Sequence, residues 1–310
     1  MFWKASMKTN KVFTIIILPL FILLLALVNG KNAAYADFQM PAIETEILLP
    51  MVMNGEAGPS GESIIIDHTT TDLRNVPVAY INKAKADLRL SYGHTSHGSQ
   101  PISGMGYLQG INSLYSFNRN GAIQVSVLSL KDYTPSGDLG NPDYWTWAVR
   151  TRDYLNTPGN DRNIVVWSWC GQVDGATEAI INDAYLGQMA ALERDFPDVT
   201  FVYMTGHLEG TGVDGNLYQR NNQIRDFVNK NGKVLFDFAD IESYDPDGNY
   251  YPDANDGCSW CQSYCDANPG FCPTPAIDCA HSHSLNCMLK GQAFWWMLAR
   301  IAGWDGVTNP

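Results

Sequence analysis

A serine and a histidine in this sequence stand in settings that suit the activation of a hydroxyl group. Ser96 lies in the glycine-flanked run Gly-His-Thr-Ser-His-Gly, and His281 follows Asp278 by three residues. A hydroxyl becomes a nucleophile when a neighbouring base takes its proton and a carboxylate orients that base. We therefore expect Ser96 to be the nucleophile, His281 the base and Asp278 the orienting group.

A second serine, Ser99, is the alternative nucleophile because it belongs to the same short segment. An amphipathic stretch from 102 to 114 follows it. Serine is a favoured residue at the start of a helix, where its hydroxyl accepts a hydrogen bond from a backbone N–H group. We therefore expect Ser99 to cap a helix.

Histidines are concentrated near these residues and permit a different chemistry. His94 and His97 belong to the glycine-flanked run, and His207 follows a separate apolar run. With Glu209 or His283 they could bind zinc, so a zinc-dependent hydrolase is an alternative. However, His94 and His97 straddle an expected turn, and the sequence has no His-Glu-x-x-His motif. We expect His94, His97 and His207 to contact substrate instead.

An acidic stretch in the last third of the chain has the spacing of a calcium-binding loop. Oxygen-bearing side chains occupy its first, third, fifth, seventh, ninth and twelfth positions: Asp245, Asp247, Asn249, Tyr251, Asp253 and Asp256. Such loops need glycine at the sixth position, where this chain has Tyr250. We expect any calcium bound here to be structural, and the nucleophilic chemistry requires no cofactor.

Tryptophan is abundant, with nine residues in the chain. Three of them, Trp145, Trp147 and Trp260, fall in segments expected to be loops, where an exposed aromatic face suits the ring of a sugar. By contrast, we expect Trp167 and the pair at 295–296 to pack in the core.

Six of the seven cysteines are crowded into a polar segment from 240 to 287, and Cys170 stands apart. The six are Cys258, Cys261, Cys265, Cys272, Cys279 and Cys287. In an exported protein this pattern predicts three disulfides, although six cysteines permit fifteen pairings and the sequence does not choose among them. The alternative is a zinc site that includes Cys258 and Cys261.

Strand-length apolar runs alternate with helical periodicity along most of the chain. The runs are 88–92, 123–128, 164–169, 200–204 and 234–238, with a short additional run at 64–66. Helical spacing appears between them, at 181–192 and 217–228, and again at 290–301. This alternation predicts an α/β domain with a parallel, doubly wound sheet.

Ligands of such a sheet bind just outside the carboxyl ends of the strands. The segments that follow the expected strands contain His94, His97 and His207, and the segment before the last expected helix contains His281 and His283. Five of the six histidines are therefore expected at this edge. We therefore expect the candidate nucleophile and base to meet at this edge.

At these positions the sequence resembles the SGNH/GDSL hydrolases. In that family the nucleophilic serine follows the first strand and an Asp-x-x-His motif precedes the last helix, as Asp278-Cys-Ala-His281 does here. The resemblance implies a flavodoxin-like three-layer sandwich, ester hydrolysis, and an oxyanion hole that includes Gln172 and the glycine after the second strand. That glycine is Gly137 or Gly140, of which we expect Gly140. Two departures stand out: the family has Gly-Asp-Ser around its serine, and asparagine where this chain has Gln172. The nucleophile motif is closer to a divergent His-x-Ser-x-Gly branch of secreted bacterial proteins.

The amino-terminal region has the features of an export signal. Lysines precede an apolar run from Val12 to Val28, and the Ala-Tyr-Ala step at 34–36 suits signal peptidase. The sequence thus predicts a signal peptide at 1–36, a linker at 37–62 and one α/β domain at 63–306. The alternative is that the apolar run remains as a membrane anchor.

Charge narrows the classes of partner. The chain carries a formal charge of −12, and loss of residues 1–36 removes four lysines and no acidic residue, which changes the charge to −16. Such a surface repels nucleic acids and anionic bilayers. We expect a secreted, extracellular enzyme that acts on a small or polysaccharide ester, without nucleic-acid partners or membrane contact after cleavage. A non-catalytic carbohydrate-binding or adhesive module on the same fold is the alternative outside enzymes.

Overall fold

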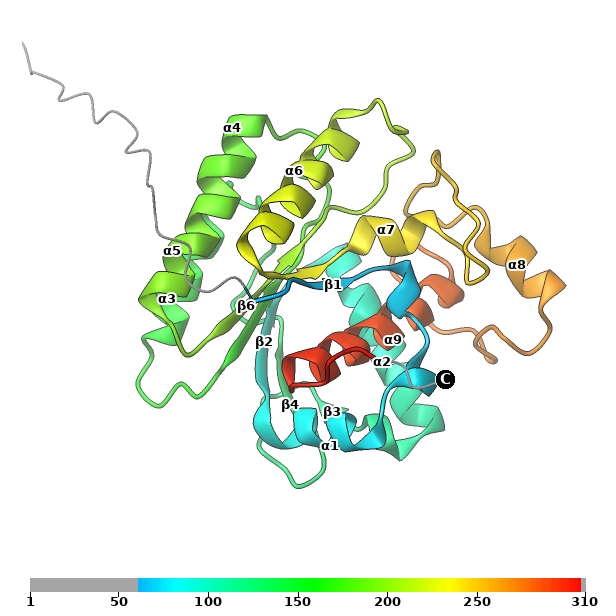
Figure 1. Ribbon diagram of the computed structural model, residues 1–310, viewed down its shortest axis with the longest axis horizontal. Helices are drawn as coiled ribbons and strands as arrows, with labels where there is room; N and C mark the ends of the chain where they lie inside the picture. The colour runs from blue at the N-terminus through cyan, green and yellow to red at the C-terminus, as the bar shows by residue number, and fades with distance from the viewer. Residues whose placement is uncertain (1–60, 308–310) are drawn as a thin grey trace, which may run out of the picture. The chain divides into compact units, whose positions relative to one another are not determined.

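The computed structural model describes residues 61–307, which form one parallel sheet covered by helices on both faces (Figure 1). The strand order is β1-β7-β6-β5-β2-β4-β3. The strands are β1 (Ile64–Ile66), β2 (Arg89–Gly93), β3 (Phe117–Asn118), β4 (Leu128–Asp132), β5 (Ile164–Trp167), β6 (Thr200–Met204) and β7 (Val234–Phe236). The expected α/β class, a flavodoxin-like three-layer sandwich, is confirmed. The predicted signal peptide at 1–36 and all but the last two residues of the linker at 37–62 lie outside the described residues.

The helices form the two outer layers. They are α1 (Val78–Asp87), α2 (Ser99–Ile111), α3 (Thr146–Leu155), α4 (Glu178–Ile180), α5 (Gly187–Asp195), α6 (Asn216–Asn231), α7 (Phe238–Ser243), α8 (Cys261–Ala267) and α9 (Ser284–Ile301), with a π-helical segment, Ile181–Leu186, that joins α4 to α5. One apolar cluster joins α1, α2 and α9 to the sheet, and a second cluster joins α3, α5 and α6 to the opposite face.

Side chains of the central strands point alternately into these two clusters. Leu90 and Tyr92 of β2 belong to the first cluster, whereas Val165 and Trp167 of β5 belong to the second. All four are buried. A parallel strand that is covered on both faces is rich in apolar residues, and β5 is apolar at all four positions. β2 departs from this pattern at Ser91, which is buried.

The strand predicted at 164–169 ends at Trp167, and two other expected strands also differ in their bounds by at least two residues. The strand predicted at 123–128 begins only at Leu128, and Ile123 and Val125 before it are 66% and 95% exposed. The strand predicted at 234–238 ends at Phe236, because the carboxylate of Asp237 accepts a hydrogen bond from the Asp240 N–H group and starts α7 there. Apolar content alone did not reveal either boundary.

Helices α2 and α9 lie side by side on one face of the sheet (Figure 1) and cross at two glycines. A β-carbon on Gly104 would overlap the carbonyl oxygen of Cys287, and one on Gly291 would overlap the backbone of Gly104. Ser96 lies three residues before α2, and His281 lies three residues before α9. The glycine crossing therefore brings the starts of the two helices, and with them the candidate nucleophile and base, to one place.

The segment that carries Asp245 to His283 is cross-linked by three disulfides. They join Cys258 to Cys261, Cys265 to Cys272, and Cys279 to Cys287, while Cys170 is free. The expectation of three disulfides is confirmed, and the pairing that the sequence left open is sequential. Three such bonds are typical of an oxidising compartment.

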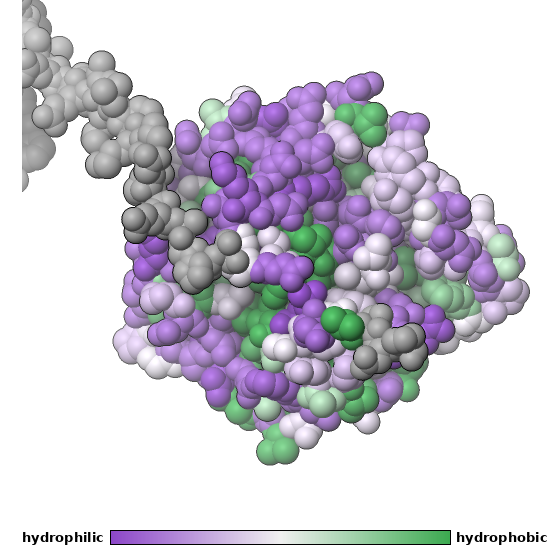
Figure 2. Space-filling view, viewed as in Figure 1, coloured by the Kyte–Doolittle hydropathy of each residue, from purple (hydrophilic) through white to green (hydrophobic). Residues whose placement is uncertain are grey.

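The surface of the domain is largely polar where its helices face solvent. Figure 2 shows mostly hydrophilic side chains over α6, as expected for an amphipathic helix that packs its buried residues on the sheet. Among residues 61–307, no helix is both long and apolar enough to cross a membrane.

Candidate active site

The candidate nucleophile lies in a short turn that the sheet holds tightly. Ser96 begins a single 3-10 turn, Ser96–Gly98, between β2 and α2. A β-carbon on Gly98 would overlap the hydroxyl oxygen of Ser168 and the β-carbon of His94. The expectation that Ser99 caps the helix is wrong: Gly98 is the N-cap residue of α2, and Ser99 is its first helical residue. The Ser99 hydroxyl donates to the carbonyl oxygen of Ser96 over 2.7 Å. Its proton is thus already engaged, whereas the Ser96 hydroxyl faces the base.

The candidate base reaches this hydroxyl directly. Ser96 Oγ and His281 Nε2 form a hydrogen bond, and both side chains can be reached from solvent. His281 adopts a left-handed backbone conformation, with φ of 61°, which is uncommon for a residue other than glycine. The Cys279–Cys287 disulfide and a 2.6 Å hydrogen bond from Gln100 Nε2 to the carbonyl oxygen of Ala280 hold this conformation in place.

The predicted orienting carboxylate does not contact the base. Asp278 is exposed, and no hydrogen bond or ion pair within residues 61–307 joins it to His281. The loop is instead ordered by its backbone and by Ser284, whose hydroxyl bonds both the N–H and the carbonyl of Ile277. In the described conformation, the orientation of the base therefore depends on the loop and not on Asp278.

A buried charged network supports the loops around the site. Lys290 Nζ in α9 binds Glu242 Oε1 at 2.5 Å and also binds Gln100 Oε1, and all three side chains are fully buried. Glu242 Oε2 accepts a 2.7 Å hydrogen bond from the N–H group of Leu208. Burial lowers the pKa of Lys290 to about 8, and the Glu242 carboxylate opposes that shift. The network links the loop after β6 to Gln100, which in turn binds the Ala280 carbonyl.

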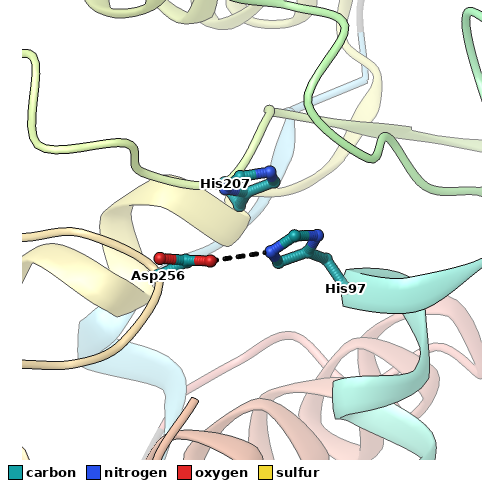
Figure 3. Close-up of side chains that lie close together, drawn as sticks. All are labelled: His97, His207 and Asp256. Atoms are coloured by element: carbon teal, nitrogen blue, oxygen red, sulfur yellow. Dashed lines mark hydrogen bonds and ion pairs between the residues drawn. The ribbon is translucent and has the colours of Figure 1, made fainter. Parts of the chain in front are cut away.

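Three imidazole rings form a stacked column beside Ser96. The ring of His97 lies 3.6 Å from that of His207, with 11° between their planes, and 4.4 Å from that of His281, with 19° between their planes. At the edge of the His97 ring, Nε2 forms a 2.9 Å hydrogen bond with Asp256 Oδ2 (Figure 3). Burial lowers the pKa of His97, although its hydrogen bond with Asp256 opposes this shift. The column is therefore held by the turn after β2, which carries His97, and by Asp256 from the cysteine-rich segment at 240–287.

The same residues have the composition of a metal site. Ligand atoms of His97, His207 and Asp256 all lie within 4.8 Å of one another (Figure 3). An imidazole binds a metal through a nitrogen lone pair that lies in the plane of its ring. Two rings stacked 3.6 Å apart at 11° cannot both direct such a lone pair at one ion. The stacked conformation therefore does not fit a shared ion unless one ring rotates.

The residues expected to form the oxyanion hole lie against each other. Gly140 has φ of +83°, and a β-carbon on it would lie 2.6 Å from Cβ of Gln172. Gln172 Oε1 accepts from the N–H group of Cys170 at 3.0 Å, and its Nε2 is 3.5 Å from Asp138 Oδ1. Asp138 also accepts from the Thr95 hydroxyl, next to Ser96. The structure thus groups Gly140 and Gln172 around Asp138. Burial raises the pKa of the Asp138 carboxyl group.

Several residues that were expected to contact substrate are buried. His94 is fully buried, with Nε2 2.7 Å from Asp132 Oδ1. Trp147 is also fully buried, and Trp260 is 3% exposed and donates to the carbonyl of Glu242. These three side chains support neighbouring elements and cannot stack on a sugar in this conformation. Trp145, at 49% exposure, keeps an accessible ring.

The acidic stretch from Asp245 to Asp256 closes on itself. The carboxylate of Asp245 accepts hydrogen bonds from the backbone and side chain of Asn249 and from the hydroxyl of Tyr251. Asp256 bonds His97 instead of joining the other acidic side chains. Among the described residues, no three carboxylates of the stretch, which also includes Asp247 and Asp253, come together. Structural calcium stays a prediction.

Gln100, Glu242 and Lys290 were not identified from the sequence as parts of the site. One signal was available for Lys290, a charge within the largely apolar last helix, whose other charge, Arg300, lies next to its end. Lysine is almost never fully buried unless it is paired, so its position implied an acidic partner. Nothing in the sequence indicated that this partner is Glu242, which lies 48 residues away.

Comparison with known proteins returned nothing: no protein-family model, no curated protein and no solved structure matches this chain.

Proposed function

We propose that the protein is a secreted serine esterase of the SGNH type, with Ser96 as nucleophile and His281 as base. The hydrogen bond between Ser96 Oγ and His281 Nε2 is the observation that carries this proposal. The pair lies beyond the carboxyl ends of the strands, where open parallel sheets bind their ligands. The predicted signal peptide and the three disulfides support an extracellular location.

The proposed reaction proceeds in two steps. Ser96 Oγ attacks the carbonyl carbon of the ester while His281 Nε2 takes its proton, and the bond to the leaving alcohol then breaks as His281 returns that proton. Water, activated by the same imidazole, hydrolyses the acyl-serine and regenerates the free hydroxyl. The Ser96 N–H group, with Gly140 and Gln172, is the proposed source of donors for the oxyanion.

The proposed substrate is a neutral ester, such as an acylated polysaccharide. The strongly acidic chain disfavours polyanions, and the exposed ring of Trp145 is available to a sugar. If the protein does not turn over esters, the same fold and aromatic surface suit the alternative, a carbohydrate-binding or adhesive module.

Hydrolysis of p-nitrophenyl acetate tests the proposal directly. Ser96→Ala should abolish turnover, and Ser99→Ala should retain most of it because the Ser99 hydroxyl is not the nucleophile. A fluorophosphonate probe should form an adduct that mass spectrometry maps to Ser96. An adduct at Ser99, or none in folded protein, would contradict the assignment. Activity that EDTA removes and zinc restores would favour the metal-dependent alternative.

A further inference from the structure

The one free cysteine belongs to a row of side chains separate from Ser96 and His281. Cys170 follows β5, is partly exposed, and has its Sγ 3.5 Å from His97 Nδ1. The other nitrogen of that ring, Nε2, is 2.9 Å from Asp256 Oδ2. Thiol, imidazole and carboxylate thus follow one another in the order found where a nucleophile is activated by a base and the base is oriented by a third group.

The partners of His97 determine which of its nitrogens accepts a proton. An ionised carboxylate only accepts hydrogen bonds, so His97 Nε2 bears a proton and donates a hydrogen bond to Asp256. The other ring nitrogen, Nδ1, then has a lone pair that faces the Cys170 thiol. Because burial lowers the pKa of His97, its ring is neutral at neutral pH and can take the thiol proton. A thiolate, not a thiol, is the nucleophilic form of cysteine.

A second, independent feature beside Cys170 indicates a ligand. His207 is 6% exposed, and its Nε2 has no hydrogen-bond partner among the described residues. Its Nδ1 lies 3.0 Å from the carbonyl of Leu208, to which it donates, so Nε2 is an acceptor. Nε2 faces Gly171, where a β-carbon would lie 3.9 Å from it and 3.0 Å from Glu209 Oε1.

No group of the described residues donates to His207 Nε2 or to the exposed Glu209 carboxylate. His207 Nε2 and Glu209 Oε1 are 3.7 Å apart, too far for a hydrogen bond but suitably spaced to receive the same N–H-bearing group. A buried acceptor without a partner is costly, so a ligand that supplies N–H groups gains binding energy there. An ammonium group meets this requirement and is also attracted by the Glu209 carboxylate.

We propose that Cys170 is a reactive thiol that forms a mixed disulfide with small disulfides that carry an amino group, which His207 and Glu209 receive. The thiol proton passes to His97, and the Cys170 thiolate attacks one sulfur of the reagent. The reagent's S–S bond breaks, and its other half leaves as a thiolate that takes the proton from His97. Cys170 is thereby oxidised, and half of the reagent is reduced to an aminothiol. This inference does not depend on ester hydrolysis.

Cystamine and the uncharged bis(2-hydroxyethyl) disulfide are suitable probes. The reaction at Cys170 is followed by intact mass and peptide mapping, and each rate is divided by that of a synthetic peptide of residues 165–175 with the same reagent. This normalisation removes the intrinsic reactivity of each disulfide. We expect cystamine to react about tenfold faster than the uncharged reagent on this normalised scale, and Cys170→Ser to form no adduct.

Variants separate the base from the ligand contact. His97→Gln and Asp256→Asn should each slow both reagents, by roughly tenfold or more for His97→Gln. Glu209→Gln should slow only cystamine. The same measurements in Ser96→Ala should be unchanged, so this inference and the esterase proposal fail separately. The inference is lost if folded protein reacts no faster than the peptide, if the two reagents have equal normalised rates, or if folded His97→Gln and Asp256→Asn react at the unmodified rate.

Discussion

The two loops that carry the candidate nucleophile and base are held by different interactions. The turn at Ser96 is embedded in the sheet, where His94 pairs with Asp132 and Gly98 packs on Ser168 without room for a β-carbon. The loop at His281 is exposed and is held by a disulfide and by hydrogen bonds of its backbone. The position of the nucleophile thus follows from core packing, whereas that of the base follows from cross-links.

This difference means that the two halves of the site can be perturbed separately, except where they share support. The shared support is the buried set of Gln100, Lys290 and Glu242, because Gln100 belongs to the helix after Ser96 and also binds the Ala280 carbonyl. The largest effects are therefore expected in this set, and smaller effects in each loop alone.

Glu242→Gln should be the most destabilising of these changes. It removes the negative partner of Lys290 from a fully buried pair, and an uncompensated buried charge costs about 3 to 5 kcal/mol. Urea unfolding followed by circular dichroism measures the loss. Asp87→Asn, which breaks the exposed pair with Lys83, is the matched control and should change stability little. Equal effects of the two substitutions would contradict a structural role of the buried network.

Loss of the Cys279–Cys287 disulfide should affect the base loop more than the sheet. Replacement of both cysteines with serine should lower stability by about 2 to 3 kcal/mol. It should also lower kcat for p-nitrophenyl acetate by about a hundredfold, because catalysis is sensitive to displacements of about an ångström. The same replacement at Cys265 and Cys272 is the control, since that pair does not flank His281. Equal kcat values in the two variants would show that the cross-link does not position the base.

Gly98→Ala should disturb the nucleophile loop. The new β-carbon would overlap Ser168 and His94, and overpacking of this kind costs about 1 to 3 kcal/mol. Gly106→Ala, in the same helix region but with no atom within 4 Å of the added carbon, should instead stabilise the protein by about 0.5 to 1 kcal/mol. Thermal unfolding distinguishes the two. A stable, fully active Gly98→Ala would mean that the turn is not restrained by the sheet.

Asp278→Asn should have a small effect on activity, within about tenfold in kcat, because Asp278 does not contact His281 in the described conformation. A triad in which this carboxylate orients the base predicts a loss of about ten-thousandfold. Steady-state kinetics at neutral pH decides between the two. A loss near the larger value would show that Asp278 moves onto His281 during turnover.

The smallest expected effect is a contribution of His97 to the pH dependence of stability. Its pKa in the folded protein is lowered by burial, so below about pH 6.5 the unfolded chain binds a proton that the folded chain does not. Stability should therefore decline as the pH falls from 6.5 toward the folded pKa. His97→Gln should remove this part of the decline, as measured by urea unfolding between pH 5 and 8. An unchanged profile would contradict the assignment.

Local patterns in the sequence were enough to predict the parallel sheet and most of its strands. The largely apolar runs at 88–92 and 200–204 correspond closely to β2 and β6, because strands covered on both faces are rich in apolar residues. The crowding of six cysteines likewise predicted three disulfides. The meeting of Ser96 with His281 follows from the element order, since both precede helices at the same edge of the sheet.

Only the tertiary structure decided which side chains around that pair touch. Lys290 and Glu242 meet because α7 packs against α9, and residues 48 positions apart leave no local trace of such a contact. From the sequence, Trp147 and Trp260 were expected to expose an aromatic face to a sugar, but packing buries both side chains. Sequence spacing determines which residues share an element, whereas burial, stacking and carboxylate partners depend on how elements distant in the chain pack together.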